Sequence, residues 1–120
     1  MIRTWSLDDD RQSLVLASQD GRLPEVVYWG ARLSGADDLA TLAVIHRIDV
    51  SGGMLDAIPD LSICPEAARS FPGQPGLVLR DRDGGALLPR FEVIAADEGA
   101  GRLVLHCRDE TLGLDYRAKF

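Results

Sequence analysis

The fold is decided by the stretch RFEVIAADEGAGRLVLHCRDETLGLDYRAKF, residues 90–120. Apolar and polar side chains alternate along it in three runs, which turn residues separate at 97–101 and 109–111. Alternation of apolar and polar residues with a period of two, which leaves one face exposed to solvent, is typical of antiparallel strands. The apolar faces are expected to consist of Phe91, Val93 and Ala95 in the first run, Leu103, Leu105 and Cys107 in the second, and Leu114, Tyr116, Ala118 and Phe120 in the third.

Shorter runs upstream have the same character. Residues 77–80 predict a strand that leads through a turn at 81–85 into the meander. Residues 3–7, 14–17 and 26–29 predict three further strands, with Asp-rich or Asp-Gly turns between them. Tyr28 and Trp29 are interpreted as core or interface residues rather than a sugar platform, and Trp29 is expected to be largely buried.

One helix is expected between residues 30 and 53. Asp37 and Asp38 precede apolar residues at helical spacing, and basic residues follow. The helical positions are Leu39, Leu42, Ala43 and His46, and the sequence Ser51-Gly52-Gly53 is expected to end the helix. A long Pro/Gly loop follows at 57–76. The predicted fold is therefore mainly β, an antiparallel β-sandwich with one short helix and a long Pro/Gly loop.

Size and charge restrict the function. The chain has 120 residues, 46% of them hydrophobic, and a net charge of −6, which fits one domain or part of one and disfavours nucleic acid as a partner. No apolar run reaches the roughly 20 residues of a membrane span, and no signal peptide is visible. The two distant cysteines are expected to be reduced thiols in a cytoplasmic protein.

The sequence offers no catalytic or metal-binding motif. Its acidic pairs all fall at expected turns, where carboxylates cap backbone groups: Asp8/Asp9/Asp10, Asp81/Asp83, Asp97/Glu98 and Asp109/Glu110. His46 and His106 lack a third ligand at a recognisable spacing. A nucleophile elbow and a phosphate-binding loop are also missing. We therefore expect no catalytic residue, no metal and no cofactor in this chain.

Two stretches resemble family-36 glycoside hydrolases, the bacterial α-galactosidases. VVYWGARL, residues 26–33, is similar to the Trp-Gly strand near the start of that family. LSICPEAARSFPGQPGL, residues 61–77, is similar to its Pro-Glu loop with a Gly-x-Pro-Gly-Leu run, and DETLGLDY, residues 109–116, resembles its Leu-Gly-Leu strand. The resemblance covers nearly the whole chain but only the opening part of the family's length, and it rests on the order and spacing of these motifs.

The resemblance implies that residues 1–120 are an N-terminal β-sandwich domain or part of one, belonging to a supersandwich and truncated before the catalytic TIM barrel. That barrel takes about 250 residues and carries the two catalytic aspartates. Because the patterned strand stops at Phe120, we expect the chain to be a fragment. Its implied partners are its own catalytic domain, other subunits of a homo-oligomer, and the galactosides that the parent enzyme hydrolyses.

The loop at residues 65–77 contains three prolines and two glycines. In tetrameric relatives the matching loop reaches a neighbouring subunit's active site, and many members carry an aspartate, an aromatic residue and an arginine in it. Here the matching segment reads FPGQP, residues 71–75, without the aspartate. The substrate-binding candidates are Glu66, Arg69, Phe71 and Gln74.

Two alternatives stay open. The prolines could simply stiffen a long connection. The chain could also be a stand-alone sandwich-fold module that binds carbohydrate or protein, without an enzymatic parent.

Overall fold

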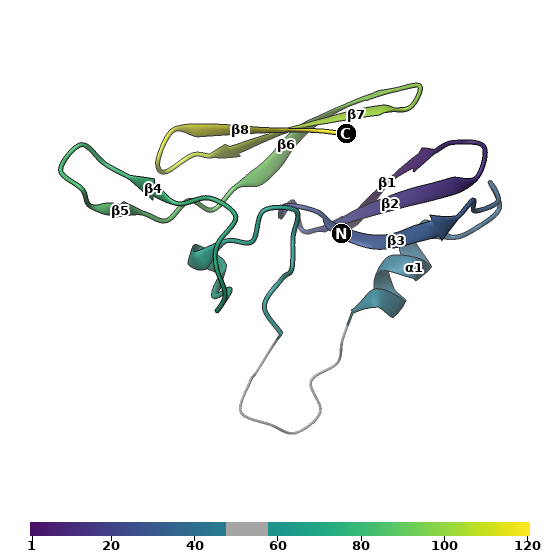
Figure 1. Cartoon of the computed structure of the whole chain (residues 1–120), viewed down its shortest axis with the longest axis horizontal. Coiled ribbons are helices and arrows are strands. Elements are labelled where there is room, and N and C mark those ends of the chain that lie inside the picture. The colour runs from purple at the N-terminus through teal and green to yellow at the C-terminus, as the bar shows by residue number, and fades with distance from the viewer. Residues whose placement is uncertain (48–57) are drawn as a thin grey trace.

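Two three-stranded antiparallel sheets face each other in the computed structural model, which describes residues 1–47 and 58–120 (Figure 1). The first sheet has the order β1-β2-β3 and the second β6-β7-β8. Their strands are β1 (Ile2–Asp8), β2 (Gln12–Gln19), β3 (Glu25–Ala31), β6 (Glu92–Gly99), β7 (Arg102–Asp109) and β8 (Leu114–Lys119). A small hairpin of β4 (Leu79–Arg80) and β5 (Ala86–Leu87) extends beside them. The expected antiparallel, sandwich-like β fold is confirmed.

The hydrophobic core lies between the two large sheets. The first sheet contributes Trp5 and Leu16, which are paired across β1 and β2. The second sheet and the connecting segments supply the other buried members: Leu23, Cys64, Phe91, Leu103, Leu105, Cys107 and Ala118. All three residues of the expected apolar face of β7 are buried, although Val104 on its other face is buried as well. Removing such side chains from water provides the main driving force for the fold.

The sheets are also joined by backbone hydrogen bonds at one corner. The N–H of Val93 donates to the carbonyl of Gly21 at 2.7 Å, and Arg22 forms an isolated bridge with Glu92. The start of β6 is therefore tied to the turn between β2 and β3. This corner fixes the position of Phe91, the residue just before β6.

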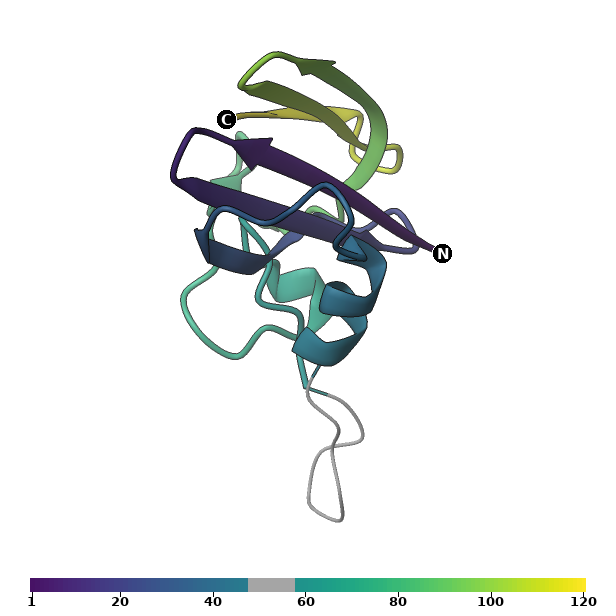
Figure 2. The same ribbon diagram turned by 90° about the vertical axis from the view of Figure 1, so that its right-hand side faces the viewer.

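The helix α1 (Leu39–His46) lies on the outer side of the first sheet (Figure 2). Asp38 is its N-cap and accepts hydrogen bonds from the N–H groups of Ala40 and Thr41 at 3.0 and 3.1 Å. Ala43 is the buried residue of the helix. The expected helix is confirmed, but it ends at His46, and the expected stop at residues 51–53 lies outside the described residues.

Three details of the strands differ from the sequence prediction. A β-bulge between Val93 and Ala95 shifts the register, so Ala96 rather than Ala95 packs against the core. The turn expected at 97–101 is confined to residues 100–101, because β6 extends to Gly99. The strand expected at 77–80 contains only Leu79–Arg80, and it pairs with β5 in a separate hairpin instead of being the first strand of the meander.

Trp29 was expected in the core, and this prediction was wrong, since 73% of the residue is exposed. Trp29 pairs with Leu14, which pairs with Leu7, so the three side chains form a row on one face of the sheet. Leu7 packs against the core. The row thus starts at the core and ends with an exposed tryptophan on the edge strand β3.

Three of the acidic residues expected at turns, Asp9, Asp81 and Asp109, accept backbone N–H groups as expected. Asp9 accepts from the N–H groups of Arg11 and Gln12, and Asp81 accepts from those of Asp83 and Gly85. Such bonds hold tight turns in place.

Asp97 is different, because it lies in β6 and pairs with Arg102 across the hairpin at 3.2 Å.

Candidate functional site

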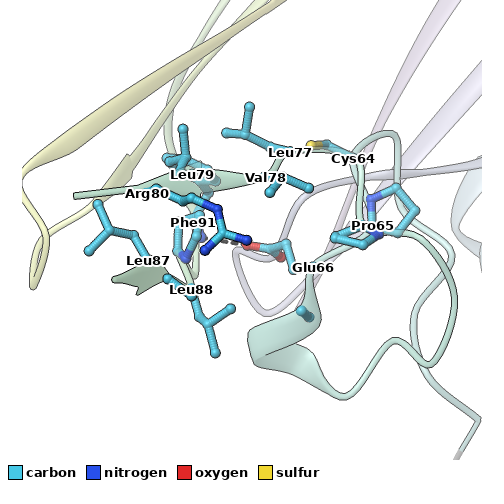
Figure 3. Close-up of a pocket in the computed structure, with 14 residues that line it drawn as sticks. Cys64, Pro65, Glu66, Leu77, Val78, Leu79, Arg80, Leu87, Leu88 and Phe91 are labelled. Carbon is cyan, nitrogen blue, oxygen red and sulfur yellow. Dashed lines mark hydrogen bonds between the residues drawn. The ribbon is translucent and has the colours of Figure 1, made fainter. Parts of the chain in front are cut away.

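An apolar groove separates the Pro/Gly loop from the β4-β5 hairpin (Figure 3). We call it the loop groove. Residues 64–67 and 75 form its loop side, residues 77–80 and 86–89 form its hairpin side, and Phe91 closes the base. Its volume is about 70 Å³. Leu77, Val78 and Leu88 at its rim are 36%, 60% and 57% exposed, so the rim presents apolar side chains to water.

Glu66 and Arg69 clamp the base of the loop to the backbone of Phe91. The Oε1 atom of Glu66 accepts the N–H of Phe91 at 2.6 Å, and Arg69 Nη2 donates to the carbonyl of Phe91 at 3.1 Å. Arg69 Nε also donates to Glu66 Oε2 at 3.0 Å. The two side chains are 5% and 10% exposed. The first two bonds satisfy both backbone groups of a buried residue that lies outside the strand ladder, and the third holds the two side chains together.

A single short turn brings the two charged residues together. Residues Ala67–Arg69 form a 3₁₀ turn, which places Arg69 three positions after Glu66 on the same side. Ser70 then adopts a left-handed conformation with φ 65° and ends the turn. The sequence therefore builds the clamp locally, and only its partner, Phe91, is distant in the chain.

The two ends of the loop are also held together. The N–H of Gly76 donates to the carbonyl of Pro65 at 2.9 Å. A Cβ atom at Gly76 would lie 2.7 Å from Cys64 Sγ and 2.9 Å from Cys64 Cα, so only glycine allows this approach. The segment between these residues is therefore a closed loop with a fixed neck.

The four candidate residues fall into two pairs. Glu66 and Arg69 are turned inward, and their polar atoms are used by Phe91 and by each other. Phe71 is partly buried and its ring lies against Gly73, whereas Gln74 is exposed. The structure thus leaves Phe71 and Gln74 at the outer part of the loop, where a partner could contact them.

The cysteines beside this region are free thiols. Burial, and secondly the negative charge of Glu66, raise the pKa of Cys107 to about 11. The same two causes raise the pKa of Cys64. Both thiols are therefore protonated at neutral pH and unsuited to act as nucleophiles.

A second hollow surrounds Trp29, and the sequence analysis missed it. We call it the Trp29 hollow. It has a volume of about 300 Å³ and is lined by Leu7, Asp8, Asp9, Gln12, Leu14, Trp29 and Gly101. Trp29 Nε1 donates to Gln12 Oε1 at 3.1 Å, and Gln12 Nε2 donates to Asp9 Oδ2 at 3.3 Å. The signal that could have found it is a tryptophan in an expected edge strand with a polar hairpin beside it.

Within residues 1–47 and 58–120, three or more His, Cys, Asp or Glu side chains nowhere gather as metal ligands would. In the same part of the chain, no helix has the length and apolar character needed to cross a bilayer. Comparisons of the chain with protein-family models, with curated proteins and with solved structures found no match.

Proposed function

We propose that this chain is a non-catalytic β-sandwich portion of an α-galactosidase, and that its loop helps to assemble the parent enzyme and to shape a neighbouring active site. The observation that carries the proposal is the form of the loop groove. Its base is fixed by the Glu66–Arg69 clamp, while its rim exposes Leu77, Val78 and Leu88. Exposed apolar side chains of this kind are typical of a surface that a protein partner covers.

The loop is built to dock with little loss of conformational freedom. Pro65, Pro72 and Pro75 each fix one φ angle, and the neck between Pro65 and Gly76 is already closed. A segment that is ordered before it binds loses less entropy on association. The outer residues Phe71 and Gln74 can then meet a sugar through stacking and hydrogen bonding.

The chemistry is assigned to another domain of the parent. Retaining glycoside hydrolysis needs two carboxyl groups about 5 Å apart on either side of the scissile bond. Glu66 is occupied by Phe91 and Arg69, and Asp9 and Asp81 are occupied by turn N–H groups. These carboxylates already have structural roles.

The proposal is tested in the full-length parent with Phe71→Ala and Gln74→Ala. An aryl α-galactoside is compared with raffinose, whose longer chain reaches further from the terminal galactose. We expect KM for raffinose to rise by about tenfold for each 1.4 kcal/mol of contact removed, with a smaller change for the aryl substrate. Glu110→Ala, in the exposed turn after β7, is the control and should change neither. Equal, small effects of the loop variants on both substrates would make the loop a stiff connector.

Two simpler experiments test the assignment to a parent enzyme. The purified chain of 120 residues should not hydrolyse an aryl α-galactoside, and turnover that follows the protein through purification would contradict this. The gene downstream of Phe120 should encode a βα-repeat region of about 250 residues. A stop codon directly after Phe120 would instead support a stand-alone binding module.

A further inference from the structure

The structure points to a second carbohydrate site, independent of the loop: we propose that the Trp29 hollow binds one pyranose residue of a neutral glycan, stacked on the indole ring of Trp29. This ring is 73% exposed, whereas the other tryptophan, Trp5, is 3% exposed. A large aromatic side chain gains from burial and has a polar N–H at one edge. Its exposure therefore leaves a surface suited to a ligand that is apolar on one face and polar at its rim.

The ring is held in place before any ligand binds. Trp29 Nε1 donates to Gln12 Oε1, and Gln12 Nε2 donates to Asp9 Oδ2. Asp9 Oδ1 is itself fixed by the N–H groups of Arg11 and Gln12 at 2.7 and 2.8 Å. The rotation of the indole is thus restrained by a chain of hydrogen bonds that ends in a tight turn. A preorganised ring loses less entropy when a ligand stacks on it.

The polar rim suits hydroxyl groups. Asp9 is exposed, and its Oδ2 atom accepts one hydrogen bond, from Gln12 Nε2. A carboxylate oxygen has two lone-pair positions, so Asp9 Oδ2 can accept a further bond from a sugar hydroxyl. The Gln12 amide offers both a donor and an acceptor. Hydroxyls that donate and accept match such a mixed rim.

The charges favour a neutral ligand over an ionic one. The hairpin turn carries the carboxylates of Asp8, Asp9 and Asp10. Arg11 and Arg32 are at the same end of the molecule, where the backbone N–H of Arg32 donates to the backbone carbonyl of Arg11 at 2.9 Å. Three negative and two positive groups leave a net charge of −1 there. This is too acidic for a phosphate and only weakly attractive to a cation.

The test uses the isolated ¹⁵N-labelled chain and the two indole N–H signals of its two tryptophans. Raffinose, maltotriose and cellotriose are each titrated to about 50 mM, which covers millimolar affinities. We expect a saturable shift of the Trp29 signal with at least one sugar, while the buried Trp5 signal stays unchanged. Saturation transfer from the protein to that sugar should be lost in Trp29→Ala.

Gln12→Ala should weaken binding by about threefold to tenfold, because the ring loses its restraint. Val26→Ala is the matched control, since Val26 lies in the same strand, is 43% exposed and does not line the hollow. The proposal is overturned if no sugar gives a saturable Trp29 shift, or if saturation transfer persists in Trp29→Ala. It is also overturned if the Trp29 signal moves on dilution without sugar and sedimentation shows dimers, because the ring would then contact a second copy. None of these results depends on the parent enzyme, so they are independent of the loop kinetics.

Discussion

Replacement of Glu66 by alanine tests the clamp that fixes the loop. The substitution leaves the Phe91 N–H without its acceptor and the Arg69 guanidinium without its counter-charge. Because the Glu66 and Arg69 side chains are 5% and 10% exposed, water cannot fully replace the lost bonds. Breaking a buried ion pair from one side costs about 3–5 kcal/mol, while a domain is stable by about 5–15 kcal/mol. We expect the urea midpoint of unfolding, followed by tryptophan fluorescence, to fall by about a fifth or more.

Four further variants, including Arg69→Ala alone, separate the clamp from a general effect of lost charge. Glu66→Gln keeps an acceptor for the Phe91 N–H and should lose less stability than Glu66→Ala. Arg69→Ala combined with Glu66→Ala gives a coupling energy through a double-mutant cycle. Arg108→Ala breaks the exposed pair with Asp115 and should change the midpoint little. A midpoint for Glu66→Ala as high as that of Arg108→Ala, together with a coupling energy near zero, would refute the reasoning.

Other predictions concern two aromatic residues, the close contact between Gly76 and Cys64, and the dependence of stability on pH. Trp29→Ala should change the free energy of unfolding by less than about 1 kcal/mol, whereas Phe91→Ala, at a 2% exposed position, should cost about 3–5 kcal/mol in urea unfolding. Gly76→Ala should cost about 1–3 kcal/mol by thermal melting, while Gly35→Ala, with no atom within 4 Å of the new Cβ, should not. Hydrogen bonds from backbone N–H groups lower the pKa of Asp109 below 3.8. The ionised Asp109 therefore stabilises the fold at neutral pH, and this stabilisation is lost as the pH falls through the lowered pKa. When the free energy of unfolding is measured between about pH 2 and 5, Asp109→Asn should lose less stability on acidification than the unchanged protein.

The sequence predicts a strand well where its two faces differ along the whole strand. In β7, Leu103, Leu105 and Cys107 are all buried as expected, although Val104 between two of them is only 7% exposed. In β6 the same reasoning failed after Val93, because a bulge inserts one residue and reverses the faces. A period of two carries no sign of such an insertion, since Ala95 and Ala96 are equally apolar.

Exposure at the edge of a sheet is also hard to predict from sequence. Tyr28 and Trp29 belong to an apolar strand, and burial of such rings is the ordinary outcome. Whether the second sheet covers the end of β3 depends on how the two sheets are placed, which no local pattern records. The exposure of Trp29 therefore became visible only in the structure.

The Pro/Gly loop was easy to recognise in the sequence, but the sequence did not show which way its polar side chains point. Glu66 and Arg69 were interpreted as possible contacts to sugar, yet both are turned toward the backbone of Phe91, 25 residues from Glu66. Charged side chains in a loop are usually solvated. They are buried when they hydrogen-bond to backbone groups that have no other partner, and such groups can lie far away in the sequence. Phe91 provides such a backbone, because it precedes β6 and lies outside the strand ladder.

The anchoring of the loop explains how one segment can be both stiff and exposed. Its neck is closed by Gly76 against Cys64, and its first turn is bound to Phe91. Cys64 and Phe91 belong to the core between the sheets, so the loop is attached to the most stable part of the molecule. Phe71, by contrast, is not among the hydrophobic side chains that pack against that core cluster, and Gln74 is exposed. A long loop that served only as a connection would need neither anchor, because the entropy of closing it grows slowly with length. Two buried anchors beneath an exposed outer part are what a surface needs if it must present its side chains to a partner in one fixed position.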